Sequence, residues 1–138
     1  MKKLPVVVGL LMAALGLAAQ AQLGSAMAAA PYSEAKDFVY LLASGSFGRA
    51  AQMVDEGHQV VHTPKSLEAG WTALLEKYGR FQALEVSGAD LSGDRWTIHV
   101  VCTFERGRVD VALDFNSITN QGKVTGVTYS KLGENERL

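Results

Sequence analysis

The sequence predicts a single α+β domain in which three N-terminal helices pack on a four-stranded antiparallel sheet. Residues 95–116 alternate apolar and polar side chains on both sides of a short break, which is typical of two long strands with one buried face. Residues 64–78 instead repeat their apolar side chains at the spacing of an amphipathic helix. Because an apolar sheet face must be covered, we expect the helices to lie on it.

The start of the chain has the features of a secretory signal peptide. Lys2 and Lys3 precede an uncharged apolar run over residues 4–19, and small residues follow that run. We expect residues 1–21 to be the signal peptide, with cleavage as late as residue 28 as the alternative. An uncleaved anchor and a buried helix are the other readings of this segment, but the run is short for a membrane span. The signal predicts a periplasmic or secreted protein that leaves the membrane after cleavage.

Three helices are expected before the sheet. After a flexible lead at residues 22–31, the first helix begins with Ser33 as its N-cap. A short second helix is expected at about residues 47–55. The third helix has the strongest signals, because Thr63 can cap it and Pro64 suits the first helical position.

The sheet is expected to follow as a meander of four strands. The first strand covers residues 81–87 and the last covers residues 123–130. Between them lie the two long strands of residues 95–116, with Arg106 and Gly107 as the expected turn. Apolar residues then face apolar residues along the whole hairpin, so the pairing register is well specified.

The expected elements place one domain at residues 32–132, followed by a polar tail at residues 133–138 that should fray. The chain has 13 basic and 14 acidic residues, and loss of Lys2 and Lys3 with the signal would leave 11 against 14, a net charge of −3. A mildly acidic domain gives no electrostatic reason to expect a nucleic acid partner. Cys102 is the one cysteine, so packing without an internal disulfide must hold the domain.

Several of these positions form a longer pattern. It consists of a Ser44-Gly45-Ser46-Phe47 turn, then Leu67, Trp71 and Leu74 at helical spacing, then Gly79 and Phe81, and finally the long meander. The pattern resembles the small nuclear-transport-factor-2-like domain of unknown function that precedes α/β-hydrolase or peptidase domains in other exported proteins. The resemblance covers residues 35–129. It implies a cone in which a curved sheet wraps around the helices and leaves a pocket between them. It implies no activity, and no catalytic residue can be carried over from it.

Four aromatic residues are the candidate ligand-binding residues of the implied pocket, because each joins an apolar ring to a polar group. They are Tyr40, Trp71, Tyr78 and Tyr129. The alternative interpretation is that they are core side chains. The expected inward face of the sheet carries no acid, and the chain lacks a glycine-rich phosphate loop, a Gly-x-Ser-x-Gly motif and a Cys-x-x-Cys motif. We therefore predict no catalytic residue, no metal ligand and no cofactor.

Two histidines lie four residues apart, a spacing that suits metal ligands on one helical face. They are His58 and His62, with Asp55 or Glu56 available as a third donor. Gly57 weakens a helix at this point, and two ligands do not make a tight site. A solvated connection between helices is the favoured interpretation.

The expected register places His99 opposite Asp114 on the polar face of the hairpin. A carboxylate that orients a histidine is a general-base arrangement. The polar residues around this pair instead favour an exposed cross-strand contact without a catalytic role. Cys102 lies mid-strand among apolar residues, where a thiol is expected to be protonated and inert.

These observations favour an exported, non-catalytic binding or interaction domain. Its expected partner is a small apolar ligand or an exported protein. Two alternatives stay open. One is an isomerase-type or hydratase-type enzyme of the same superfold, which would need an acid or a histidine inside the cone. The other is a self-associating structural module that forms a homodimer.

Overall fold

The computed structural model describes residues 30–118 and 122–133. The expected signal peptide, all but the end of the expected lead, and residues 134–138 of the expected tail lie outside these residues. Within the described part of the chain, no helix has the length and apolarity needed to cross a membrane.

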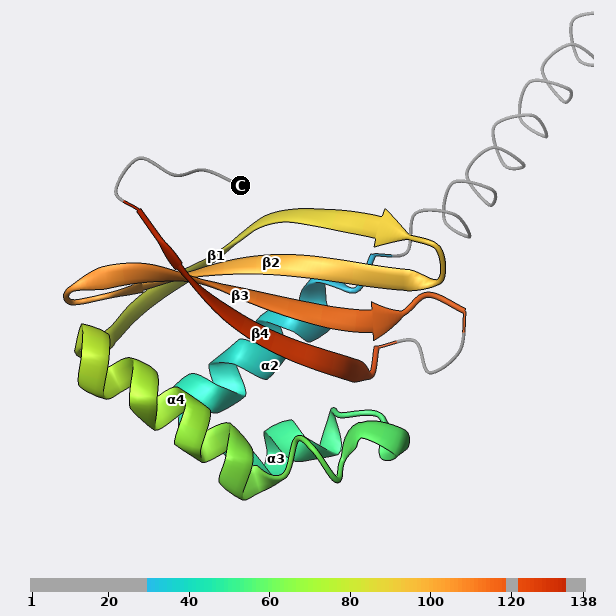
Figure 1. Ribbon diagram of the computed structural model, residues 1–138, viewed down its shortest axis with the longest axis horizontal. Coiled ribbons are helices and arrows are strands. Elements are labelled where there is room, and N and C mark those ends of the chain that lie inside the picture. Colours follow the sequence, from blue (N-terminus) through green and yellow to red (C-terminus); the bar gives the residue numbers. More distant parts are fainter. Residues whose placement is uncertain (1–29, 119–121, 134–138) are drawn as a thin grey trace, which may run out of the picture.

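The described residues form an α+β fold with three α-helices and a four-stranded antiparallel sheet, as predicted. The elements are α2 (Tyr32–Ala43), α3 (Phe47–Gln52), the short 3-10 helix η1 (Glu56–His58), α4 (Pro64–Tyr78), β1 (Phe81–Ser92), β2 (Arg95–Phe104), β3 (Gly107–Asn116) and β4 (Val124–Leu132). The strands lie in the sheet in the order β1-β2-β3-β4. All three α-helices lie on the same side of this twisted sheet (Figure 1).

The predicted start and end of α4 are confirmed. The Thr63 side chain accepts a hydrogen bond from the backbone N–H of Ser66 at 3.1 Å, and Pro64 occupies the first turn. Gly79 follows the helix with φ of 84°, a conformation that costs glycine little. The chain therefore turns sharply from α4 into β1.

The first two helices differ from the prediction in their bounds. Ser33 lies inside α2, whose N-cap is Pro31, with no side-chain hydrogen bond at the cap. The second helix ends at Gln52 because the next residues pair with β4. The Val124 N–H donates to the Met53 carbonyl at 2.8 Å, and the Asp55 N–H donates to the Val124 carbonyl at 2.8 Å. These bonds draw the chain out of the helix before residue 55.

The outer strands are longer than predicted. β1 continues past its expected end at residue 87 to Ser92, and β4 ends at Leu132 instead of residue 130. An irregularity between Val86 and Gly88 absorbs the glycine, after which β1 resumes its pairing with β2. The pairing of β1 with β2 therefore extends to Ser92, opposite Arg95.

The turn between β2 and β3 lies one residue earlier than predicted. Phe104 pairs with Gly107, so Glu105 and Arg106 form the turn, and Val100 opposes Val111 instead of Leu113. The change in register is two residues along the partner strand, so every side chain stays on its predicted face. The opposed pairs nevertheless change, and with them the neighbours of each polar residue.

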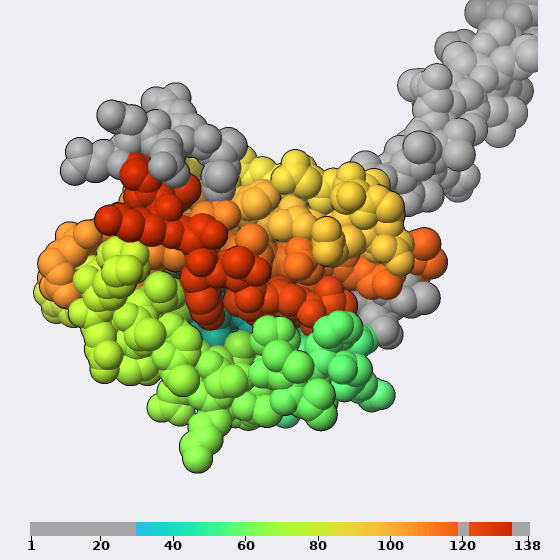
Figure 2. All heavy atoms as spheres, in the orientation of Figure 1, coloured from blue at the N-terminus to red at the C-terminus, as the bar shows by residue number. Residues whose placement is uncertain are grey.

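Apolar side chains fill the space between the helices and the sheet. The largest fully buried ones are Trp71, Phe38, Phe115, Leu42, Ile98 and Leu113. The Trp71 ring lies 5.7 Å from the Phe81 ring and 5.5 Å from the Phe104 ring, centroid to centroid. Figure 2 shows atoms of the helices meeting those of β4 along one side of this core. The inner face of the sheet is thus occupied by the protein's own side chains.

Gly107 provides a test of how closely α4 and the hairpin pack. A Cβ atom at this position would lie 2.9 Å from Cδ1 of the Tyr78 ring, which is only 6% exposed. We expect Gly107→Ala to lower the free energy of unfolding by about 1–3 kcal/mol, because the ring has little room to move. Urea denaturation measures this change. As the control, Gly48→Ala in α3 adds a methyl group with no atom within 4 Å, and should leave stability equal or raise it by up to about 1 kcal/mol. Equal midpoints for the two variants would contradict the packing described here.

Candidate functional site

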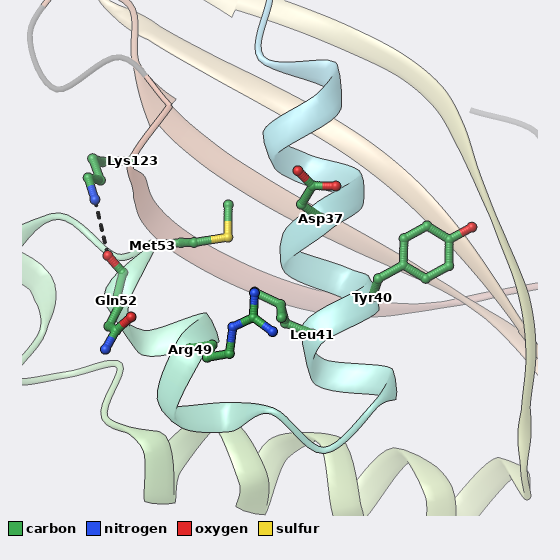
Figure 3. Close-up of a pocket in the computed structure, with 7 residues that line it drawn as sticks. All are labelled: Asp37, Tyr40, Leu41, Arg49, Gln52, Met53 and Lys123. Carbon is green, nitrogen blue, oxygen red and sulfur yellow. Dashed lines mark hydrogen bonds between the residues drawn. The ribbon is translucent and has the colours of Figure 1, made fainter.

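A surface depression of about 600 Å³ lies between α2, α3 and the residue that precedes β4 (Figure 3). Its lining residues are Asp37, Tyr40, Leu41, Arg49, Gln52, Met53 and Lys123. We call it the helical depression. It exists because α3 is short: the chain leaves the helix after Gln52 to pair with Val124, which brings Lys123 beside α3.

The helical depression carries two positive charges and one negative charge. The Lys123 ammonium group donates a hydrogen bond to the Gln52 carbonyl at 3.1 Å. Arg49 projects from α3 into the depression, on the same side as Asp37 and Leu41 (Figure 3). Among the described residues, Arg49 has neither an ion pair nor a side-chain hydrogen bond. Its guanidinium donors are therefore free to bind an acceptor from another molecule.

Of the four aromatic residues expected in a pocket, only Tyr40 lines the helical depression. It lies at the rim, 51% exposed, with its ring directed away from Arg49 and Met53 (Figure 3). Trp71 and Tyr78 are core residues, at 2% and 6% exposure. Tyr129 packs against α4, where its Cε2 atom lies 3.2 Å from the position of a Cβ on Gly70. The structure thus places these four side chains in different environments.

Burial also determines the protonation of Tyr129. Removal from water disfavours the phenolate, and together with a smaller contribution from Cys102 it raises the pKa of Tyr129 to about 12. The group is a neutral phenol at physiological pH. It can donate or accept a hydrogen bond but cannot act as a base there.

A second polar arrangement lies on the outer face of the sheet, which is the face turned away from the helices. The His99 ring lies between two carboxylates: its Nδ1 is 2.9 Å from Oδ2 of Asp110 on β3, and its Nε2 is 3.0 Å from Oδ2 of Asp90 on β1. We call these three residues the carboxylate–imidazole chain. The expected pairing of His99 with Asp114 is wrong, because the observed register puts Ala112 opposite His99. Asp114 instead accepts a hydrogen bond from Thr97 at 2.7 Å.

The two carboxylates of the carboxylate–imidazole chain favour the charged form of His99. Partial burial by itself lowers the pKa of His99, but the hydrogen bonds and charges of Asp110 and Asp90 outweigh it, so that the pKa lies above its ordinary value of 6.5. Both ring nitrogens already contact carboxylates, so neither faces a substrate position. The nearby Ser87 hydroxyl donates to the backbone carbonyl of His99 at 3.4 Å, not to its ring.

The two other histidines do not converge on a metal site. Nδ1 of His58 lies 3.1 Å from Oδ2 of Asp55, and the ring is about half exposed. Partial burial, followed by the charge of His58, lowers the pKa of His62. Across residues 30–118 and 122–133, no group of three or more His, Cys, Asp or Glu side chains is placed to hold a metal ion.

The sequence did not point to Arg49, Lys123 or Asp37 as site residues. They lie on three segments that the local pattern does not relate, and each alone looks like an ordinary solvated charge. The sequence feature that comes closest to marking the site is Arg49, a long charged residue next to the small Ala50 and Ala51, which are buried in the short helix α3.

Comparison of the chain with models of protein families, with curated proteins and with solved structures gave no match.

Cys102 provides a test of the interior of the sheet. It is fully buried, and desolvation, followed by the charge of Asp110, raises the pKa of its thiol to about 12. We expect a maleimide reagent at neutral pH to label the native protein at least about 100-fold more slowly than the urea-unfolded chain, because the thiol is both protonated and inaccessible. Labelling followed by mass spectrometry measures both rates. Similar rates in the two states would show that the strand is open to solvent.

Proposed function

We propose that this chain is a non-catalytic, exported binding domain, and that its helical depression holds an acidic group of a protein partner. The observation that carries the proposal is the Arg49 guanidinium, which faces a concave surface without an ion pair among the described residues. An arginine in such a position is suited to a carboxylate, which it can bind through two parallel hydrogen bonds. Leu41 and Met53 offer apolar contact beside it.

The contents of the interior support a binding role over a catalytic one. The inner side chains of β2 and β3 are apolar and buried, among them Ile98, Val100, Val111 and Leu113. Cys102 is the titratable group on this face of the two strands, and its raised pKa, about 12, leaves it protonated. An isomerase or hydratase needs a base whose pKa lies near the working pH, directed at the substrate. The charged residues on these strands lie on the outer face or in the turn.

The packing supports a protein partner over a small apolar ligand. The place expected for an apolar molecule, between the helices and the sheet, is filled by Phe38, Leu42 and Trp71. The helical depression is open to solvent and carries charged groups. An apolar ligand would bury part of Arg49 without a hydrogen-bond acceptor, which costs free energy. On a partner's surface, an acidic side chain could bind the Arg49 guanidinium while a neighbouring apolar side chain contacts Leu41 and Met53.

The proposal includes the nuclear-transport-factor-2-like cone as the fold of the domain. It is supported by the succession of helices and antiparallel strands and by the twist of the sheet over the helices in Figure 1. Export is inferred from the apolar start of the sequence after Lys2 and Lys3.

The proposal can be tested by selecting peptides from a random phage-displayed library on the immobilised protein. We expect the selected peptides to combine Asp or Glu with a neighbouring apolar residue. Charge reversal in Arg49→Glu should weaken binding of a selected peptide by at least about tenfold, since a charge-assisted hydrogen bond contributes roughly 1.5–3 kcal/mol. Isothermal titration calorimetry measures the affinity.

The matched control is Lys36→Glu, which makes the same charge change on the exposed face of α2, outside the helical depression. It should leave the affinity within about twofold, because an exposed charge that does not line the depression is screened by salt. Equal weakening of peptide binding by both variants would show that the loss of affinity comes from the net charge of the protein and not from Arg49. Selected peptides that bind Arg49→Glu as well as they bind the original protein would overturn the proposal.

A further inference from the structure

The carboxylate–imidazole chain connects three adjacent strands through one ring. Asp90 lies on β1, His99 on β2 and Asp110 on β3, so the chain of contacts runs across the sheet from its edge inward. Within the described part of the chain, β1 is an edge strand whose one partner is β2, and its pairing is irregular between Val86 and Gly88. The side-chain contact of Asp90 lies beyond that irregularity, in the last paired segment of the edge strand, and adds to the backbone pairing there.

We infer that the carboxylate–imidazole chain is a proton-dependent clamp: protonated His99 holds the segment 88–92 of β1 on the sheet, and loss of the proton releases that segment. The inference is independent of the proposed binding function, because it concerns the opposite face of the sheet. It assigns a regulatory role to residues that the helical depression does not use.

The number of protons on the His99 ring decides how many of its two contacts are hydrogen bonds. Both contacts are hydrogen bonds only when both nitrogens carry a proton, because carboxylates accept and do not donate when ionised. A neutral imidazole has one N–H, and its other nitrogen presents a lone pair. One of the two carboxylates would then face that lone pair and lose its bond.

The exposure of the two carboxylates decides which contact is lost. The Asp110 side chain is 7% exposed, and its Oδ1 atom has no hydrogen-bond partner among the described residues, whereas the Asp90 side chain is 77% exposed. A buried carboxylate that loses its donor cannot be compensated by water, but an exposed one can. Neutral His99 therefore keeps its proton on Nδ1 for Asp110, and the Nε2 contact with Asp90 breaks. The break lies on the side of the edge strand.

The charges around the ring favour the clamped state. Among the described residues on the outer face, Glu85 on β1 and Asp114 on β3 add negative charge, and Arg95 on β2 and Arg108 on β3 add two positive charges. β4 contributes Ser130 and Thr128, which do not titrate. On the inner face, Cys102 stays protonated because its pKa is about 12. Acidic groups thus predominate around His99.

The direction of the pH dependence follows from the raised pKa of His99 in the folded protein. The clamp contributes its full stabilisation below 6.5, the value for the free side chain, and loses it as the pH rises through the higher value of the folded state. β1 is therefore held in mildly acidic solution and freer in alkaline solution.

Amide hydrogen exchange by NMR tests the clamp residue by residue in the intact protein. We expect the protection factors of residues 88–92 to fall by about tenfold between about pH 6 and about pH 9, while those of β3 change little. In Asp90→Asn, which alters an exposed residue, this fall should disappear. In His99→Gln, which does not titrate, protection should be low and independent of pH. If His99→Gln fails to fold, Asp90→Asn still decides the question.

The nitrogen chemical shifts of the His99 ring provide a second readout that a merely structural contact would not move. They should show both nitrogens protonated at about pH 6, and Nδ1 alone protonated at alkaline pH. An Nε2–H tautomer at alkaline pH would overturn the inference. An unchanged protection step in Asp90→Asn would overturn it as well.

Discussion

The structure depends on the contact between the end of α4 and the turn of the β2–β3 hairpin. The Arg106 N–H donates to the Tyr78 carbonyl at 2.7 Å, and the Glu105 N–H donates to the Arg80 carbonyl at 3.0 Å. In return the Arg80 N–H donates to the Glu105 carboxylate at 2.7 Å, and this hydrogen bond is the largest cause of the lowered pKa of Glu105. These bonds hold Glu105 and Arg106 in the turn. These hydrogen bonds therefore fix the register of the β2–β3 hairpin and the cross-strand neighbours of its side chains.

One consequence of this register is the division of the sheet into two chemically different faces. The inner face packs against the helices and contains the core around Trp71. On the outer face this register brings Asp110 within reach of His99, whereas a turn one residue later would have placed Asp114 opposite His99. The pairing of β1 with β2 brings Asp90 to the other ring nitrogen. Apolar side chains of the protein itself fill the interior. The helical depression is an open surface feature lined in part by the charged residues Asp37, Arg49 and Lys123, and it is not an enclosed apolar cavity.

The prediction succeeded where a single segment carries its own signal. The amphipathic pattern, Thr63, Pro64 and Gly79 located α4, and strict alternation located the faces of β2 and β3. The prediction of element bounds failed where pairing with a distant segment decides where a helix or strand ends. The second helix ends early because Val124 pairs with the residues after it, and β1 passes through Gly88 because β2 offers partners as far as Arg95.

The candidate site was the least predictable part of the molecule, since Arg49 and Lys123 meet only after α3 and the start of β4 have come together. By itself the sequence determined the class of fold and the face to which each hairpin side chain points, because both follow from the periodicity of apolar residues along a short stretch. Only the tertiary structure decided the opposed pairs, the partners of His99 and the lining of the helical depression. Those depend on hydrogen bonds between segments far apart in the chain, which leave no periodic trace in either segment.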